Sequence, residues 1–223
     1  MSSLAAVVFD FDGIILDSET AEFESHRLLY ERSGAALTPD EWCDQIGVWT
    51  EGEEQRWCTR LTELTGVAHD FATFKTDQHR FFQEIVSQEP MRGIRELLEV
   101  LAQAQVPLAI ATTSPARWVV PAVERLDLRG RFQAIVTADD VERRKPAPDV
   151  YLEATRRLRA DPLRSVAIED SAPGIAAATA AGMKTVAIPH WLTESHDLAA
   201  ATLRVVHAGE LTIEMLEALV DGT

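Results

Sequence analysis

The chain has 223 residues, of which 46% are hydrophobic, and it carries a formal net charge of −15. A chain of this length can bury one sizeable core and has residues left for a second small subdomain. It contains no apolar run of about 18 residues that would predict a membrane span, and its start lacks the basic and apolar regions of a secretory signal. We therefore expect a cytoplasmic protein, and the acidic charge argues against nucleic acid as a partner because such partners are bound by clustered Lys and Arg.

Short apolar segments along the sequence predict a buried parallel sheet. The first covers residues 4–9, similar segments follow at 106–111, 134–136, 165–168 and 184–188, and residues 203–206 could add an edge strand. Helical patterns separate most of these segments. Short apolar strands that alternate with helices indicate right-handed crossovers and a three-layer α/β sandwich.

The alternation stops between about Glu19 and Pro90, where the spacing of apolar residues is helical throughout. Thr38, Pro39 and Glu41 have the pattern of a helix start with a capping box. An insertion of roughly seventy residues is too long for a plain loop. We predict a helical cap at 18–90 and a catalytic core formed by 1–17 and 91–223.

Chemically reactive side chains follow four of the predicted strands, where open parallel sheets bind their ligands. They are Asp10 and Asp12 after the first strand, Thr112, Thr113 and Ser114 after the second, Lys145 beyond the third, and Glu169 and Asp170 after the fourth. Hydroxyls and amides at a helix start suit a phosphate, and adjacent carboxylates are costly to bring together unless a cation balances them.

Each group also has a purely structural interpretation. Asp10 and Asp12 could belong to a turn that ends at Gly13, Ser114 or Asp170 could cap a helix, and Lys145 could be a solvated surface lysine. Taken together, the groups supply what phosphoryl transfer requires: a nucleophile, a proton carrier, donors for the phosphoryl oxygens, and ligands for a divalent cation. The two cysteines lack the spacing of a metal-binding pair.

The segments around these residues closely resemble the four sequence motifs of the haloacid-dehalogenase superfamily, in order and spacing. The matching stretches begin at Asp10 (DFDGIILDS), Thr112, Lys145 (KPAPD) and Glu169 (EDSAPG). The resemblance covers nearly the whole chain and implies a Rossmann-like core with a helical cap inserted after the first strand.

The resemblance also implies roles for the residues that match. Asp10 would be the nucleophile that forms an aspartyl-phosphate, and Asp12 would protonate the leaving oxygen and then deprotonate water. Mg²⁺ would be held by Asp10, the backbone carbonyl of Asp12 and Asp170, with Glu169 binding directly or through water. The phosphoryl oxygens would be held by Thr112, the Thr113 amide and Lys145, with Ser114 close by.

Within this family the presence of Asp12 disfavours dehalogenation and leaves phosphatase and phosphomutase chemistry. The mutase pattern of β-phosphoglucomutase has a histidine where this chain has Glu22 and an arginine soon after a cap glycine, in the region of Trp49. Neither feature is present, so a phosphatase for a small phosphorylated metabolite such as a sugar phosphate is favoured. His26, one helical turn beyond Glu22, could partly substitute for the mutase histidine.

Two alternatives stay open. One is a phosphomutase on a hexose phosphate, and the other is a catalytically silent binding or regulatory protein that kept the fold. We expect the cap to contribute substrate contacts, with Glu22, His26 and Trp49 as candidates, while most cap tryptophans are expected in its core. A monomer is the expected state.

Overall fold

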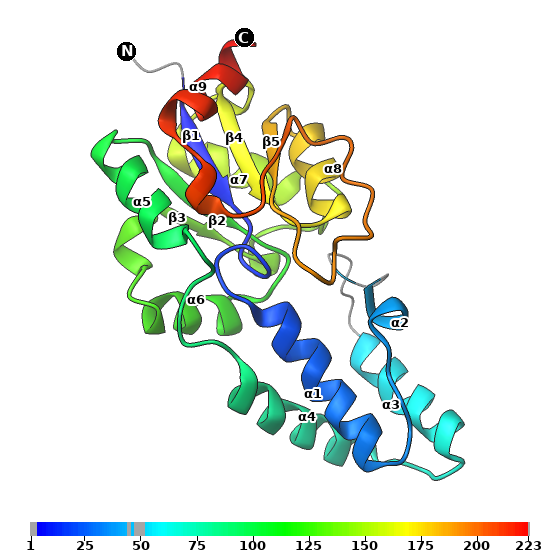
Figure 1. Cartoon of the computed structure of the whole chain (residues 1–223). Coiled ribbons are helices and arrows are strands. Elements are labelled where there is room, and N and C mark those ends of the chain that lie inside the picture. Colours follow the sequence, from blue (N-terminus) through cyan, green and yellow to red (C-terminus); the bar gives the residue numbers. More distant parts are fainter. Residues whose placement is uncertain (1–3, 44–45, 47–51, 223) are drawn as a thin grey trace.

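A six-stranded parallel sheet lies at the centre of the computed structural model, which describes residues 4–43, 46 and 52–222 (Figure 1). The strands lie side by side in the order β3 (Ala134–Val136), β2 (Leu108–Ala111), β1 (Ala6–Phe9), β4 (Ser165–Glu169), β5 (Lys184–Ala187) and β6 (Leu203–Arg204). Every predicted strand is present, with ends that differ by one or two residues. Because the chain leaves β1 toward β2 on one side and reaches β4 on the other, the strand order reverses at β1, where such sheets bind ligands.

Helices cover both faces of the sheet and give the predicted three layers (Figure 1). One face packs against α5 (Ile94–Gln103), α6 (Ala116–Arg125) and α9 (Ile213–Asp221), and the other packs against α7 (Asp149–Leu158) and α8 (Ala172–Ala180). Successive side chains of a strand point to opposite faces. In β1, Val7 and Phe9 therefore enter the first layer of core and Val8 enters the second.

Within the described part of the chain, four helices follow β1 and form a separate lobe, which we call the cap: α1 (Ser18–Arg32), α2 (Pro39–Cys43), α3 (Glu53–Thr65) and α4 (Phe71–Ile85) (Figure 1). No strand occurs among the described residues of this lobe, as predicted. At the start of α2, the backbone N–H and hydroxyl of Thr38 donate to the Glu41 carboxylate and the Glu41 N–H donates to the Thr38 hydroxyl, which confirms the capping box.

Aromatic side chains make the core of the cap. Phe23 and Tyr30 from α1 pack with Trp42, Trp57 and other apolar residues of the lobe, and the rings of Trp42 and Trp57 stack with centroids 4.9 Å apart. Both described cap tryptophans, Trp42 and Trp57, thus lie in its core, as expected. No helix within the described ranges is both long and apolar enough to cross a membrane.

Candidate active site

Asp10 and Gly13 occupy the turn that follows β1 at the edge of the sheet where the strand order reverses. The Asp10 N–H donates to the carbonyl of Ile168 at 2.9 Å, so Asp10 extends beside the end of β4. Gly13 has φ +75° and its backbone lies against Asp170, whose Oδ2 would be 2.6 Å from a Cβ at position 13. A residue without a side chain is therefore needed for the chain to turn here.

Three buried carboxylates meet at this edge. Asp10, Glu169 and Asp170 each offer an oxygen within 4.8 Å of the others. Lys145 is also buried, and its Nζ lies 2.8 Å from Asp10 Oδ1 and 2.6 Å from Glu169 Oε1. One ammonium against three carboxylates leaves an excess of negative charge, and a donor set of carboxylate oxygens suits a hard divalent cation. The cluster can bind a metal ion.

Burial dominates the electrostatics of this cluster. It raises the pKa of Asp10 to about 8, with a further contribution from the charge of Glu169 that Lys145 only partly offsets. Burial, followed by the charges of Glu169 and Asp10, raises the pKa of Asp170 well above its usual range. Burial opposes the charge of Lys145, but the two neighbouring carboxylates outweigh it and raise the pKa of this lysine. Asp10 and Asp170 therefore hold protons more tightly than usual unless a cation replaces those protons.

Glu169 is held by donors at both carboxylate oxygens. Its Oε1 accepts from Lys145 Nζ at 2.6 Å and from the Tyr151 hydroxyl at 2.5 Å. Its Oε2 accepts from the N–H of Asp170 at 3.2 Å and from the N–H and hydroxyl of Ser171 at 3.4 and 3.2 Å. Because its oxygens already have these partners, Glu169 is better placed to hold Lys145 and to support a metal site than to supply its main ligand.

Asp12 lies outside that group of three carboxylates and is surrounded by uncharged donors. Its Oδ1 accepts from the Ser18 hydroxyl at 2.6 Å and from the Trp118 indole Nε1 at 3.1 Å. Its Oδ2 accepts from the Ser114 hydroxyl at 2.6 Å and from the Thr112 hydroxyl at 3.4 Å. Two carboxylates only two residues apart in sequence thus have very different neighbours.

The segment after β2 is ordered by its own hydrogen bonds. Thr112 is buried, its N–H donates to the carbonyl of Val136, and its hydroxyl accepts from the Ser114 N–H at 3.0 Å. The N-cap of α6 is Pro115, which makes no side-chain capping bond, so the Ser114 hydroxyl serves Asp12 and not the helix. Thr113 is half-buried between these two residues.

A cavity of about 630 Å³ lies between the core and the cap. Asp12, Pro115 and Trp118 line it from the core, and the cap contributes mainly α1 and α4, through Glu19, Glu22, Lys75, Gln78 and Phe82, together with Trp42. The cavity gives a small molecule access to Asp12 and encloses it between apolar and polar walls, as ligand sites commonly do.

The three predicted cap residues have different positions. Glu22 lines the cavity. His26 is buried and packs against Trp42 and Phe74, with ring centroids 4.8 and 5.7 Å away, and its Nδ1 bonds the Glu22 carbonyl at 2.8 Å. The structure therefore places His26 in the cap core, away from the cavity lining. Trp49 lies outside the described residues.

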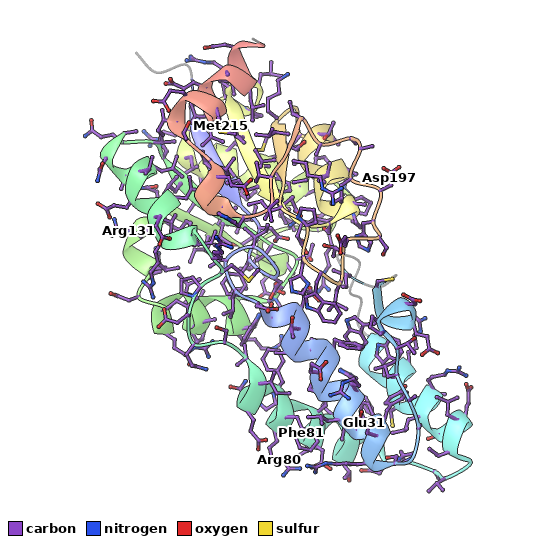
Figure 2. All side chains as sticks on the ribbon, viewed as in Figure 1. Glu31, Arg80, Phe81, Arg131, Asp197 and Met215 are labelled. Carbon is purple, nitrogen blue, oxygen red and sulfur yellow. The ribbon has the colours of Figure 1, made fainter. Side chains whose placement is uncertain are left out.

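Some basic residues of the cap line the cavity and others lie away from it. Lys75 and His79 line the cavity. Arg60 pairs with Glu41 and Glu63, and Arg80 lies over the Phe81 ring, 4.7 Å from its centroid, at the end of the cap far from the sheet (Figure 2).

The sequence reasoning did not select Glu19 or Trp118. Glu19 is half-buried beside the cavity, and burial, with the charges of Asp12 and Glu22 as further causes, raises its pKa well above the usual range. Its position directly after Ser18, in the first turn of the helix that follows the first motif, could have identified Glu19 as a candidate site residue from the sequence. Trp118 gave a weaker one, as a large aromatic residue in the first turn of the helix that follows Ser114.

Comparison with known proteins identifies the family. The model of the haloacid dehalogenase-like hydrolases matches residues 7–188, a range that includes all the candidate active-site residues described above. The chain belongs to the haloacid dehalogenase-like hydrolase family. The four sequence motifs predicted this family, which is a family of hydrolases.

Three similar proteins illustrate the range of this family. A phosphorylated carbohydrates phosphatase of Thermotoga maritima is 34% identical over 187 residues, which cover 82% of this chain and 84% of the relative. The crystal structure of CbbY from Rhodobacter sphaeroides in complex with phosphate has a TM-score of 0.71 at 25% identity and covers 93% of this chain and 96% of that one. A β-phosphoglucomutase from Clostridium difficile shares the fold, with a TM-score of 0.76 at 20% identity and 98% coverage of both chains.

Proposed function

We propose that this protein is a Mg²⁺-dependent phosphatase that hydrolyses the phosphate ester of a small carbohydrate-like metabolite through an aspartyl-phosphate on Asp10. The observation that carries this proposal is the arrangement of Asp10, Lys145, Glu169 and Asp170 at the sheet edge, next to a cavity into which Asp12 faces. The phosphatase of Thermotoga maritima supports the choice of phosphorylated carbohydrates as the substrate class.

The two aspartates would divide the reaction into two steps. The Asp10 carboxylate attacks phosphorus, the bond from phosphorus to the ester oxygen breaks, and Asp12 gives its proton to that oxygen. In the second step the Asp12 carboxylate takes a proton from a water molecule that attacks the phosphorus. The bond to Asp10 breaks, inorganic phosphate leaves, and both aspartates return to their first state.

The remaining polar groups would bind the phosphoryl oxygens and the cation. Lys145, the Thr112 hydroxyl and the Thr113 N–H would hold the phosphoryl group, with Ser114 nearby. Asp10, Asp170 and the backbone carbonyl of Asp12 would hold Mg²⁺, supported by Glu169. A bound Mg²⁺ supplies positive charge that favours ionised Asp10 and offsets charge on the transferred group.

Phosphate release from a panel of esters tests this function. The panel contains phosphorylated sugars, phosphogluconate-like acids and phosphoglycolate, assayed with Mg²⁺ and again after chelation. We expect release by the wild type, reversible loss on chelation, and loss in Asp10→Asn with folding intact. Asp197→Asn, at an exposed aspartate in the segment after β5 (Figure 2), is the matched control and should keep full activity. Near-normal release by Asp10→Asn would rule out the nucleophile.

A phosphomutase is the second candidate, because a β-phosphoglucomutase shares this fold. By the sequence resemblance, Glu22 stands where the mutase pattern has histidine. The packing of His26 inside the cap core leaves it poorly placed to replace that residue. Incubation with a sugar phosphate and a trace of the corresponding bisphosphate separates the two activities. Isomerised product without net release of phosphate would favour the mutase.

We also propose the division of the chain into a core of 1–17 and 91–223 and a cap of 18–90. The helices α1 to α4 support it, since α1 begins at Ser18 and α4 ends at Ile85. Expression of the core with 18–90 replaced by a short linker would test whether it folds alone. The cytoplasmic location and the monomeric state stay predictions.

A further inference from the structure

Trp118 contacts Asp12 through a group that cannot act in any other way than as a donor. The indole Nε1 lies 3.1 Å from Asp12 Oδ1, and the residue itself is half-buried in the wall of the cavity. An indole N–H has no lone pair to offer and does not titrate in the range of protein function. The Oδ1 atom of Asp12 is therefore held as an acceptor.

The other partners of Asp12 differ in this respect. Ser18, Thr112 and Ser114 bond it through hydroxyls, which can rotate and can accept as well as donate. Each of these hydroxyls can turn to follow Asp12, at Oδ1 as well as at Oδ2, whereas the indole can only donate. Among the described partners of Asp12, the indole N–H is therefore the one whose role as a donor is fixed.

The indole ring is fixed from two sides. It packs edge-on against Phe11 of the β1 turn, with centroids 6.3 Å apart, and against Phe82 of α4, with centroids 5.1 Å apart. A ring held by both the core and the cap has little freedom to follow Asp12. The N–H therefore sets the orientation of the carboxylate, and the carboxylate does not set that of the ring.

From these contacts we infer that Trp118 is a positioning residue, which orients the Asp12 carboxylate for proton transfer to the leaving group. This inference rests on the proposed function, in which Asp12 is the proton carrier. A hydrogen bond to a charged group contributes enough to change a rate by about tenfold when it is removed.

Single-turnover cleavage of two kinds of ester tests the inference. One ester is the sugar phosphate that the wild type hydrolyses fastest, whose alkoxide leaving group needs a proton. The other is p-nitrophenyl phosphate, whose leaving group is stable without one. Trp118→Phe keeps an aromatic ring between Phe11 and Phe82 but removes the N–H. We expect a fall of about tenfold for the sugar ester and less than about threefold for the aryl ester.

Trp191→Phe is the matched control. The Trp191 indole Nε1 donates to the Thr20 hydroxyl at 2.8 Å, near the start of α1, and among the described residues it forms no hydrogen bond with Asp12. This variant also loses one indole hydrogen bond, and both esters should react within about twofold of the wild-type rate. Equal losses for the two esters in Trp118→Phe, or losses no larger than in the control, would show that Trp118 only packs and would overturn the inference.

A second measurement does not depend on turnover or on the folding of Trp118→Phe. The assigned ¹H–¹⁵N signal of the Trp118 indole should move upfield in Asp12→Ala, because its carboxylate acceptor is gone, while the Trp191 signal stays in place. An unmoved Trp118 signal would overturn the inference. Failure of the proposed function gives a different result, namely a wild type that releases no phosphate or an Asp10→Asn variant that still does.

Discussion

Replacing Lys145 by methionine would remove the ammonium group that lies between two buried carboxylates. The Lys145 side chain is 2% exposed, and its Nζ is 2.8 Å from Asp10 and 2.6 Å from Glu169, whose side chains are 10% and 0% exposed. Methionine has a similar length and fills the space, so the substitution mainly deletes the charge and its hydrogen bonds. The carboxylates of Asp10, Glu169 and Asp170 would then face one another without that cation.

The expected loss of stability follows from these distances. At an effective dielectric constant of about 20, each ion pair at this separation has a Coulomb attraction of about 6 kcal/mol. Much of that attraction is offset by the cost of taking the charges out of water, and removal of one partner from a buried pair costs about 3–5 kcal/mol. We expect the upper part of that range for Lys145→Met, because two carboxylates lose the same partner. The total free energy of unfolding of a folded protein is about 5–15 kcal/mol.

Urea denaturation at about pH 9 in the presence of a chelator measures this loss, because the pKa of Asp10, raised to about 8, leaves that carboxyl ionised there. The matched control is Lys184→Met, since Lys184 is half-buried on β5 of the same sheet but forms no ion pair within the described ranges, and it should change stability by less than about 1 kcal/mol. Lower pH should restore part of the stability of Lys145→Met, because protons then neutralise the carboxylates. Added Mg²⁺ should also restore part of it.

The result that would refute this reasoning is a Lys145→Met variant that unfolds at the same urea concentration as Lys184→Met, with no response to pH or Mg²⁺. It would mean that Lys145 does not offset the negative charge of the carboxylates beside it in the way that the distances indicate.

The remaining predictions concern packing, acid stability and metal binding. Gly174→Ala should cost about 1–3 kcal/mol in urea denaturation and lower turnover, because its Cβ would lie 2.0 Å from the Glu169 carboxylate. Burial lowers the pKa of His26 to about 4, so the unfolded chain binds a proton there that the folded one does not, and stability is lost as pH falls from about 6.5 to 4. In His26→Phe, the loss of unfolding free energy over that pH range should be smaller by roughly 3 kcal/mol. A pH dependence equal to that of the wild type would contradict this prediction. Because burial raises the pKa of Asp10 to about 8, protons compete with the cation for this carboxylate. Titration calorimetry should therefore find that Mg²⁺ affinity rises between about pH 6 and 8. An affinity that does not change with pH would contradict Asp10 as a ligand.

The convergence of the charged residues was predictable from the sequence because strands in a parallel sheet end at a common edge. Phe9 pairs with Ile110 on one side and with Ile168 on the other. This register places Asp10 beside Glu169. The apolar runs of β1, β2 and β4 stop at or just before Asp10, Thr112 and Glu169, so the ends of these runs locate the carboxyl edge of the sheet.

The contacts of the cap were not predictable in the same way, because a helix presents different residues according to its rotation. Glu22 and His26 lie one turn apart on α1, yet one lines the cavity and the other is packed among aromatic rings. The rotation of α1 is set by packing against α4, including the hydrogen bond of 2.9 Å from Gln78 to Ser25. These partners are 53 residues apart, and no local pattern reveals them.

The surroundings of Asp10 and Asp12 differ in a way that supports the different roles we propose for them. Asp10 lies among charges, with Lys145 and two carboxylates around it, so its ionisation responds to any added cation. Asp12 lies among hydroxyls and the Trp118 indole, which supply hydrogen bonds to its carboxylate but no charge. A nucleophile must be ionised when the substrate arrives, and a proton carrier must change state twice in each cycle. The first environment suits the proposed nucleophile and the second suits the proposed proton carrier. This distinction depends on residues more than a hundred positions away in the chain.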